Sequence, residues 1–423
     1  MIDPDGLNVW NGERLVGYLW RTAQGLIGFR YDQTWLRQNN FAVSQTLPLQ
    51  EKEFAPEHLT SGKNLAHRFF ANLLPEGNVR AQIIRDLKIA DTDFDLLRAI
   101  GGECAGALSI LPVEQEPAAN YDYHRIAEDD LANLIARRGR VFTWTANERP
   151  RLSLAGAQDK CPILLKDNHY WLPKQESPSS HILKFELSDY RHLPAYETFT
   201  TQLAGAVGLP VVNIQLRSVG KTHYALIERY DRHHDENGRI ERLHQEDFCQ
   251  ALGFGHERKY QADGGPTFAD CYRLIEDVSS EPADDLQVLL RWQIFNVLAG
   301  NSDGHAKNLS LLYEPSGATR LAPCYDLVCT RAIERIDQRL AFAVGDERDP
   351  NLITAQHWTQ LAQQCGIRPR FLHQHVHNLA ENLLQQLQPA LEFFVNNYGN
   401  YAALQQIEQI VTKQCRRVLS ENA

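Results

Sequence analysis

Apolar and polar positions alternate over short stretches of the first 115 residues, which is typical of strands that bury one face. The predicted strands are 14–20, 26–31 and 107–113. Apolar residues recur with helical spacing at 64–74 and 76–87, and Pro75 closes the first of these helices. An acidic stretch containing Pro and Asn follows at 113–124 and is typical of a linker. We therefore predict a mixed α/β segment at 1–115.

Short apolar runs separated by turns dominate the next segment and predict a second β-rich region at 140–240. Its predicted strands are 151–156, 160–166, 169–174, 180–186, 211–218 and 223–230. One helix interrupts them at 194–209, and Gly208 and Pro210 end it.

Beyond residue 241 the spacing is helical almost throughout, including the apolar run at 284–300. The exception is a single strand pair, 308–314 and 318–326, joined by the turn at 315–317. We predict a helical segment at 241–423.

Composition narrows the class of protein. The chain of 423 residues is 43% hydrophobic and 23% charged, as expected of a chain that folds rather than a disordered one. Its formal net charge of -10 argues against coating nucleic acid by charge alone. Local basic groups remain at Arg368 and Arg370, and at Lys413, Arg416 and Arg417, but solvated helix faces and ends are the favoured interpretation of each.

We expect neither export nor a membrane span, because the sequence has no signal-like apolar region and no long apolar run. The eight cysteines form no CxxC pair and are expected to be reduced core thiols in a cytosolic protein. His233 and His234 are predicted at a solvated loop tip. His373 and His377 lie four apart on a helix without an evident third metal ligand.

A group of polar residues follows the apolar helix at 284–300. Asp303 and Asn308 are five positions apart, the spacing that separates the catalytic aspartate from the metal-binding asparagine in protein kinases. The strand pair then delivers Asp326, where a kinase carries its second metal-binding residue, and Lys307 could help to neutralise a transferred phosphoryl group. A plain turn would also explain Asp, Gly and Asn in this loop, but it would not explain Asp326.

The preceding segment contains matching candidates. Lys184 on a predicted strand could bind phosphate, with Glu197 on the next helix as its partner, although a solvated lysine and an exposed carboxylate are the simpler interpretations. The loop 152–160 could place its backbone amides around Gly156 against phosphates, but one glycine is a weak signal. The order of elements favours an α+β, protein-kinase-like bilobal fold, with a small mixed α/β N-terminal lobe and a large all-helical C-terminal lobe.

Several longer motifs along the chain are distinctive in combination: FFANLLPEGNVRAQI, RLSLAGAQDK, SHILKFE, LIERYDR, HQEDFCQALG, KYQADGGP, NSDGHAKNLS and APCYDL. Through these motifs the chain resembles the HipA family of bacterial toxin kinases. The resemblance implies a serine/threonine protein kinase that uses ATP and Mg²⁺, with Asp303 as catalytic base and Asn308 and Asp326 as metal ligands. The implied nucleotide-contacting residues are Ala155, Gly156, Ala157, Gln158, Asp159, Lys160, Lys184, Glu228, Arg229, Tyr230, His305, Ala306, Lys307, Asn308, Tyr325 and Asp326.

The resemblance also implies regulation and partners. Ser153 matches the serine that family members phosphorylate on themselves, and Ala155 stands where shorter relatives carry a second serine. The implied partners are a HipB-like helix-turn-helix antitoxin, operator DNA bound through that complex, and an aminoacyl-tRNA synthetase substrate. The glutamyl enzyme is the first candidate, and another synthetase such as the tryptophanyl enzyme, or a different protein, stays open. A bacterial cytoplasmic location follows, near the nucleoid when the antitoxin is bound. A small-molecule kinase and a co-repressor with a decayed kinase site remain as alternatives.

Overall fold

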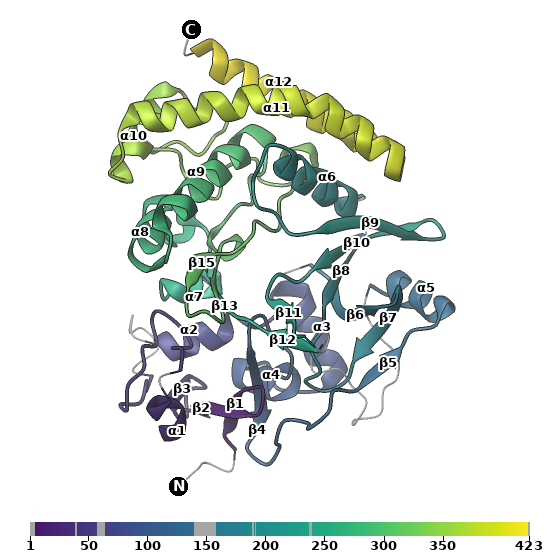
Figure 1. Cartoon of the computed structure of the whole chain (residues 1–423), viewed down its shortest axis with the longest axis vertical. Coiled ribbons are helices and arrows are strands. Elements are labelled where there is room, and N and C mark those ends of the chain that lie inside the picture. Colours follow the sequence, from purple (N-terminus) through teal and green to yellow (C-terminus); the bar gives the residue numbers. More distant parts are fainter. Residues whose placement is uncertain are drawn as a thin grey trace. The chain divides into compact units, whose positions relative to one another are not determined.

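The computed structural model describes residues 5–38, 40–56, 64–138, 158–187, 190, 192–236 and 239–421. The chain divides into two compact units (Figure 1). The first contains residues 1–184, 229–257 and 311–318, and the second contains 185–228, 258–310 and 319–423. The predicted boundaries of the segments 1–115, 140–240 and 241–423 stay a prediction.

The first unit begins with a four-stranded antiparallel sheet in the order β3-β2-β1-β4. Its strands are β1 (Leu7–Asn11), β2 (Arg14–Arg21), β3 (Ile27–Tyr31) and β4 (Leu108–Pro112). The helices of this part are α1 (Gln33–Arg37), α2 (Leu65–Ala71), α3 (Gly77–Leu87) and α4 (Asp93–Ile100). Apolar side chains of the sheet, α2 and α4 share one core, which includes Val9, Phe29, Phe70 and Phe94. The strands and helices predicted here are confirmed, whereas β1, α1 and α4 were not predicted.

A second group of strands in this unit pairs in the order β5-β7-β6-β8. These are β5 (Tyr123–Arg125), β6 (Lys160–Lys166), β7 (His169–Pro173) and β8 (His181–Phe185), and α5 (Glu128–Ala136) lies between β5 and β6 in sequence. The predicted strands at 160–166, 169–174 and 180–186 are confirmed. The predicted strand at 151–156 lies outside the described residues.

The remaining elements of the first unit are the hairpin β11 (Arg232–His234) and β12 (Ile240–Arg242), the strand β13 (His244–Asp247), the short helix α7 (Phe248–Ala251) and, except for Ser310, the strand β14 (Ser310–Tyr313). The prediction of only one strand pair beyond residue 241 was wrong, because β13 is a further strand. Its two buried positions are polar, His244 and Glu246, so no apolar alternation marks it. His233 and His234 are exposed, as predicted, but they lie within β11.

The second unit is mainly helical. It contains α6 (Leu193–Ala206), α8 (Phe268–Val278), α9 (Pro282–Ala299), α10 (Ala355–Gln364), α11 (Pro369–Tyr398) and α12 (Ala402–Glu421), and α11 lies beside α12 (Figure 1). Its strands are β9 (Ile214–Val219), β10 (Thr222–Glu228) and β15 (Thr319–Leu321), of which β9 and β10 form the predicted hairpin. Short 3-10 turns lie at His256–Arg258, where the units meet in sequence, and at Gln261–Asp263, Ala306–Asn308 and Thr330–Ala332.

The eight cysteines are all free and buried, so the prediction of core thiols is confirmed. Burial raises the pKa of the Cys161 thiol to about 12 and keeps it protonated at neutral pH. No helix in the described part of the chain is long and apolar enough to cross a bilayer.

Candidate active site

The loop that carries Asp303 begins where α9 ends. Pro282 begins this helix, and Gly300 ends it in the left-handed conformation, with φ of 75°, a common helix stop. Directly after the stop, the Asn301 side-chain amide donates to Asn296 Oδ1 at 3.0 Å, and Asn301 Oδ1 accepts the Asp303 N–H at 3.2 Å. The buried side chains of Asn296 and Asn301 therefore fix the backbone of the loop, while the Asp303 side chain stays exposed.

Gly304 explains why the loop can lie so close to α9. A Cβ at this position would lie 2.5 Å from Asn296 Nδ2 and 3.3 Å from the Trp292 ring, and both of those side chains are buried. Any side chain at Gly304 would therefore displace the support under Asp303.

Tyr260 orients the Asp303 carboxylate. Its hydroxyl donates to Asp303 Oδ1 at 2.7 Å, and its ring packs edge-on against His305 with centroids 5.1 Å apart. The Ala306 N–H donates to the Lys259 carbonyl at 3.5 Å, which anchors the loop to the same segment. Tyr260 is not among the site residues predicted from the sequence. The only local sign of a function was its place in the KYQADGGP motif.

Asn308 is buried, yet its Oδ1 has no hydrogen-bond partner. A buried amide oxygen without a donor is costly, but it is suited to a cation. The three residues before it, His305, Ala306 and Lys307, are also buried.

The segment that follows β15 is held to this loop by hydrogen bonds of Tyr325. Its hydroxyl donates to the Lys307 carbonyl at 2.8 Å and lies 2.7 Å from the Ser310 hydroxyl. The next residue, Asp326, has φ of 54°, a left-handed conformation that is uncommon for a residue other than glycine. Tyr325, which precedes Asp326, is therefore bonded to Lys307, which precedes Asn308, while the metal pair Asn308 and Asp326 stays a prediction.

In the first unit, Lys160 of β6 lies directly opposite Lys184 of β8 in the strand register. Directly opposite side chains share a face of the sheet, so two cations are held at neighbouring positions. Lys184 is only 6% exposed, which rules out a solvated strand residue. Like charges placed in this way favour an anionic ligand.

The predicted adenine-contacting segment is 228–230. In the second unit, Glu228 Oε2 accepts from the Asn213 side-chain amide at 3.0 Å. In the first unit, Arg229 uses all of its guanidinium nitrogens on Glu103, Ser179, Asp231 and the Cys104 carbonyl. The Tyr230 hydroxyl donates to Gln245. Any contribution of Arg229 to a nucleotide must therefore come from its backbone.

The structure brings together Asp303, His305, Asn308, Tyr325 and Asp326 in the second unit, and Lys160 and Lys184 in the first. Gln158 and Asp159 immediately precede β6, and Asp159 lies 4.0 Å from Arg138. Ser153, Ala155, Gly156 and Ala157 lie outside the described residues. Glu197 is buried within α6, so the interpretation as an exposed carboxylate was wrong, while its pairing with Lys184 stays a prediction.

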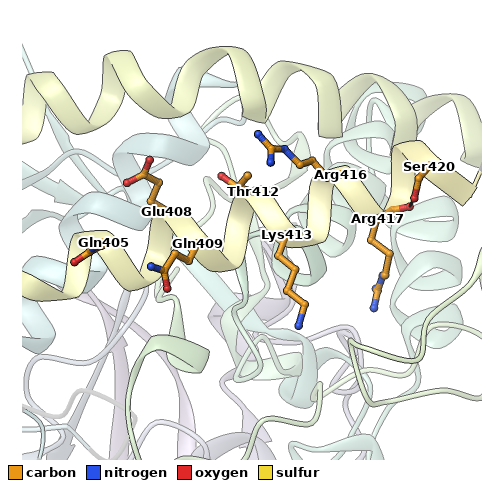
Figure 2. A pocket seen from close by; sticks show the side chains of 8 residues that line it. All are labelled: Gln405, Glu408, Gln409, Thr412, Lys413, Arg416, Arg417 and Ser420. Carbon is orange, nitrogen blue, oxygen red and sulfur yellow. Dashed lines mark hydrogen bonds between the residues drawn. The ribbon is translucent and has the colours of Figure 1, made fainter.

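A pocket of about 840 Å³ lies along α12. Its lining residues are Gln405, Glu408, Gln409, Thr412, Lys413, Arg416, Arg417 and Ser420 (Figure 2). Lys413 and Arg417 point to the same side of the helix, and Arg416 points to the other. These residues include none of those predicted to bind nucleotide, and their cations do not converge on one point, so the predicted nucleotide site does not lie in this pocket.

The chain matches two family models that follow each other along the sequence. Residues 7–111 match the HipA N-terminal domain, and residues 152–387 match the HipA-like C-terminal domain.

Relatives match over nearly the full length. A putative kinase, Y4mE, of Sinorhizobium fredii is 35% identical, covering 97% of this chain and 98% of its own. The serine/threonine-protein kinase toxin HipA of Shewanella oneidensis is 30% identical, covering 89% of this chain and 87% of its own. The solved complex of HipA, HipB and operator DNA from that organism matches with a TM-score of 0.83 and 28% identity, over 98% of this chain and 97% of the solved chain. The predicted α+β, kinase-like fold class is thereby confirmed.

Proposed function

Since this chain belongs to the HipA family and is a serine/threonine-protein kinase, we propose that it is the toxin of a type II toxin–antitoxin system and transfers phosphate from ATP, with Mg²⁺, to a protein hydroxyl. The observation that carries the proposal is the loop after α9. It holds an exposed aspartate, oriented by Tyr260, three residues after Gly300, which caps a buried helix.

In this proposal Asp303 accepts the proton of the acceptor hydroxyl. The 2.7 Å hydrogen bond from Tyr260 fixes one carboxylate oxygen and leaves the other to face the substrate. Lys184 and Lys160 bind nucleotide phosphates, and the segment 228–230 receives the adenine. Positioning of this kind supplies most of the catalysis in phosphoryl transfer.

The residues present fit a magnesium ion. Asn308 offers a buried oxygen without a donor, and Asp326 offers a carboxylate one residue beyond the Tyr325 tether. Because phosphate oxygens and waters complete the shell of a nucleotide-bound Mg²⁺, one or two protein ligands are enough. The ion would neutralise charge on the phosphates.

An aminoacyl-tRNA synthetase is the proposed substrate, with the glutamyl enzyme as the first candidate, so phosphorylation would arrest translation and growth and promote persistence. The test is phosphoproteomics after induced expression of the wild type and of Asp303→Asn. A synthetase phosphosite that appears only with the wild type supports this substrate. An unphosphorylated synthetase pool in growth-arrested cells contradicts it.

Ser153 is proposed to switch the kinase off. Its phosphorylation would add about -1.5 to -2 charges beside the proposed phosphate-binding loop and repel ATP. The loop that carries Ser153 is proposed to cover ATP in the active kinase. We therefore propose that one molecule phosphorylates Ser153 of another. An autophosphorylation rate per molecule that rises with protein concentration supports this route, and a constant rate removes it.

Co-repression of the operon is proposed to need an antitoxin. With a net charge of -10, this chain is expected to reach operator DNA mainly through a small basic HipB-like dimer. The solved Shewanella oneidensis complex of HipA, HipB and operator DNA supports this arrangement. Operator binding by the purified chain alone, as tight as that of the complex at physiological salt, would overturn it.

A further inference from the structure

Four charged side chains form a buried cluster in the first unit, here called the Glu103 cluster: Glu103, Arg229, Asp231 and Arg232. Their side chains are between 0% and 3% exposed. Glu103 comes from the segment before β4, within the part that matches the HipA N-terminal domain. The other three come from the segment after β10, within the part that matches the C-terminal domain.

The Glu103 carboxylate is bonded to two elements of the proposed nucleotide site. One oxygen accepts from the Ser179 N–H at 2.9 Å and from the Ser179 hydroxyl at 3.0 Å. Ser179 lies two residues before β8, the strand that carries Lys184. The other oxygen accepts from Arg229 Nη1 at 2.8 Å. One buried side chain thus ties the start of the lysine-bearing strand to the proposed adenine-contacting segment.

Asp231 completes the hold on that segment. It accepts from Arg229 Nε at 2.9 Å and Nη2 at 2.7 Å, and from the Gly106 N–H at 2.7 Å. The Arg229 N–H donates to the Ser180 carbonyl at 3.0 Å. Both the side chain and the backbone of Arg229 are therefore fixed.

Burying charged side chains in such a cluster adds little net stability to a fold. Removing charges from water costs several kcal/mol per ion, and apolar replacements of buried ion pairs are often at least as stable. Burial alone would raise the pKa of Glu103, but Arg229 and Arg232 hold that pKa well below its usual range, so the carboxylate is ionised. Apolar side chains could fill the same space, but they could not form the directional hydrogen bonds that this cluster forms.

We propose that Glu103 is a positioning residue for the nucleotide site, which makes the N-terminal part of the chain a component of ATP binding. Glu103 acts through Ser179 on β8 and through Arg229 on the segment 228–230, and it does not itself contact the nucleotide. This inference rests on the proposed function.

The test measures the affinity for a non-hydrolysable ATP analogue with Mg²⁺, and KM for ATP and kcat, in the full-length Glu103→Gln variant. Gln keeps the shape but removes the charge that orients Arg229. We expect affinity to fall and KM to rise by about tenfold, in line with the loss of a charged hydrogen bond, with kcat at saturating ATP within about twofold. Amide exchange at 228–231 should become faster.

The control is Val9→Ala, which removes apolar volume from the fully buried β1 core in the same N-terminal part. It should lower stability without changing ATP affinity. Ser179→Ala provides a second, milder variant that keeps both charges and loses one hydroxyl, and it should shift KM in the same direction. It decides the question if Glu103→Gln does not fold.

ATP affinity within twofold of the wild type in the folded variants would overturn the inference. An equal loss of affinity in Val9→Ala would also overturn it, because general destabilisation would then explain the effect. Failure of the wild type to bind nucleotide would instead overturn the proposed function, so the two failures are distinct.

Discussion

Gly304→Ala tests the account of the loop with the smallest possible change. The added methyl carbon would lie 2.5 Å from Asn296 Nδ2, whereas ordinary contact begins near 3.4 Å. Either the loop or the buried asparagine must therefore move by about 1 Å. Asn296 supports Asn301, which in turn accepts the Asp303 N–H, so the shift is passed to Asp303, the proposed base.

Overpacking of this kind costs about 1–3 kcal/mol, and a catalytic group misplaced by about 1 Å can lose roughly 10²-fold in rate. We expect single-turnover phosphoryl transfer by Gly304→Ala to fall by about that factor. ATP affinity should change by only a few-fold, because Asp303 is not proposed to bind ATP.

The matched control is Gly205→Ala in α6, where the new carbon would meet only Val211 Cγ2 at 3.1 Å and alanine favours the helix. This variant should keep full activity. A folded Gly304→Ala protein with wild-type transfer rates would refute the supporting role of Asn296.

Three further outcomes are expected. Asn308→Ala should raise the Mg²⁺ concentration needed for half-maximal activity by at least about tenfold while the fold stays intact, because Asn308 Oδ1 has no hydrogen bond to lose; an unchanged Mg²⁺ requirement would remove Asn308 as a ligand. Stoichiometric phosphorylation of Ser153 should weaken ATP binding, and Ser153→Ala should stay active after prolonged incubation with ATP; unchanged affinity of the phosphorylated form would remove the switch. Burial raises the pKa of Glu246 to about 7 despite its bonds to Ser44, Gln45 and Tyr313, so the folded state holds a proton that the unfolded state releases near pH 4.5. The stabilisation is therefore present below that pH and is lost as pH rises to about 7, by up to roughly 3 kcal/mol; in Glu246→Gln this decline in the urea midpoint should disappear, and an identical slope would contradict it.

The strands β2, β6 and β7 and the helices α3, α6 and α9 could be predicted because each has a regular apolar spacing and clear end signals, such as Pro282 and Gly300. The spacing of Asp303, Asn308 and Asp326 allowed their roles to be predicted, because one reaction would use all three, and those roles stay a prediction. Strand β13 could not, because its buried positions are polar and are satisfied by residues far away in sequence. His244 lies 2.8 Å from the Val43 carbonyl, and Glu246 accepts from Ser44.

Tyr260 and Glu103 could not be predicted from the sequence for the same reason. Tyr260 precedes Asp303 by 43 positions, and Glu103 precedes Arg229 by 126. The local sequence gives little sign of a function for either residue, for Tyr260 only its place in the KYQADGGP motif, since each acts through a contact that the fold creates.

The central claim is that Asp303 is the base for phosphoryl transfer, and purified Asp303→Asn tests it most directly. Asn keeps the size of the side chain and can still accept the Tyr260 hydrogen bond, but it cannot take the proton. The account predicts unchanged folding and ATP affinity, and a transfer rate to protein substrate and to Ser153 lower by roughly 10²–10⁴-fold. A rate near that of the wild type, with ATP bound normally, would contradict the account.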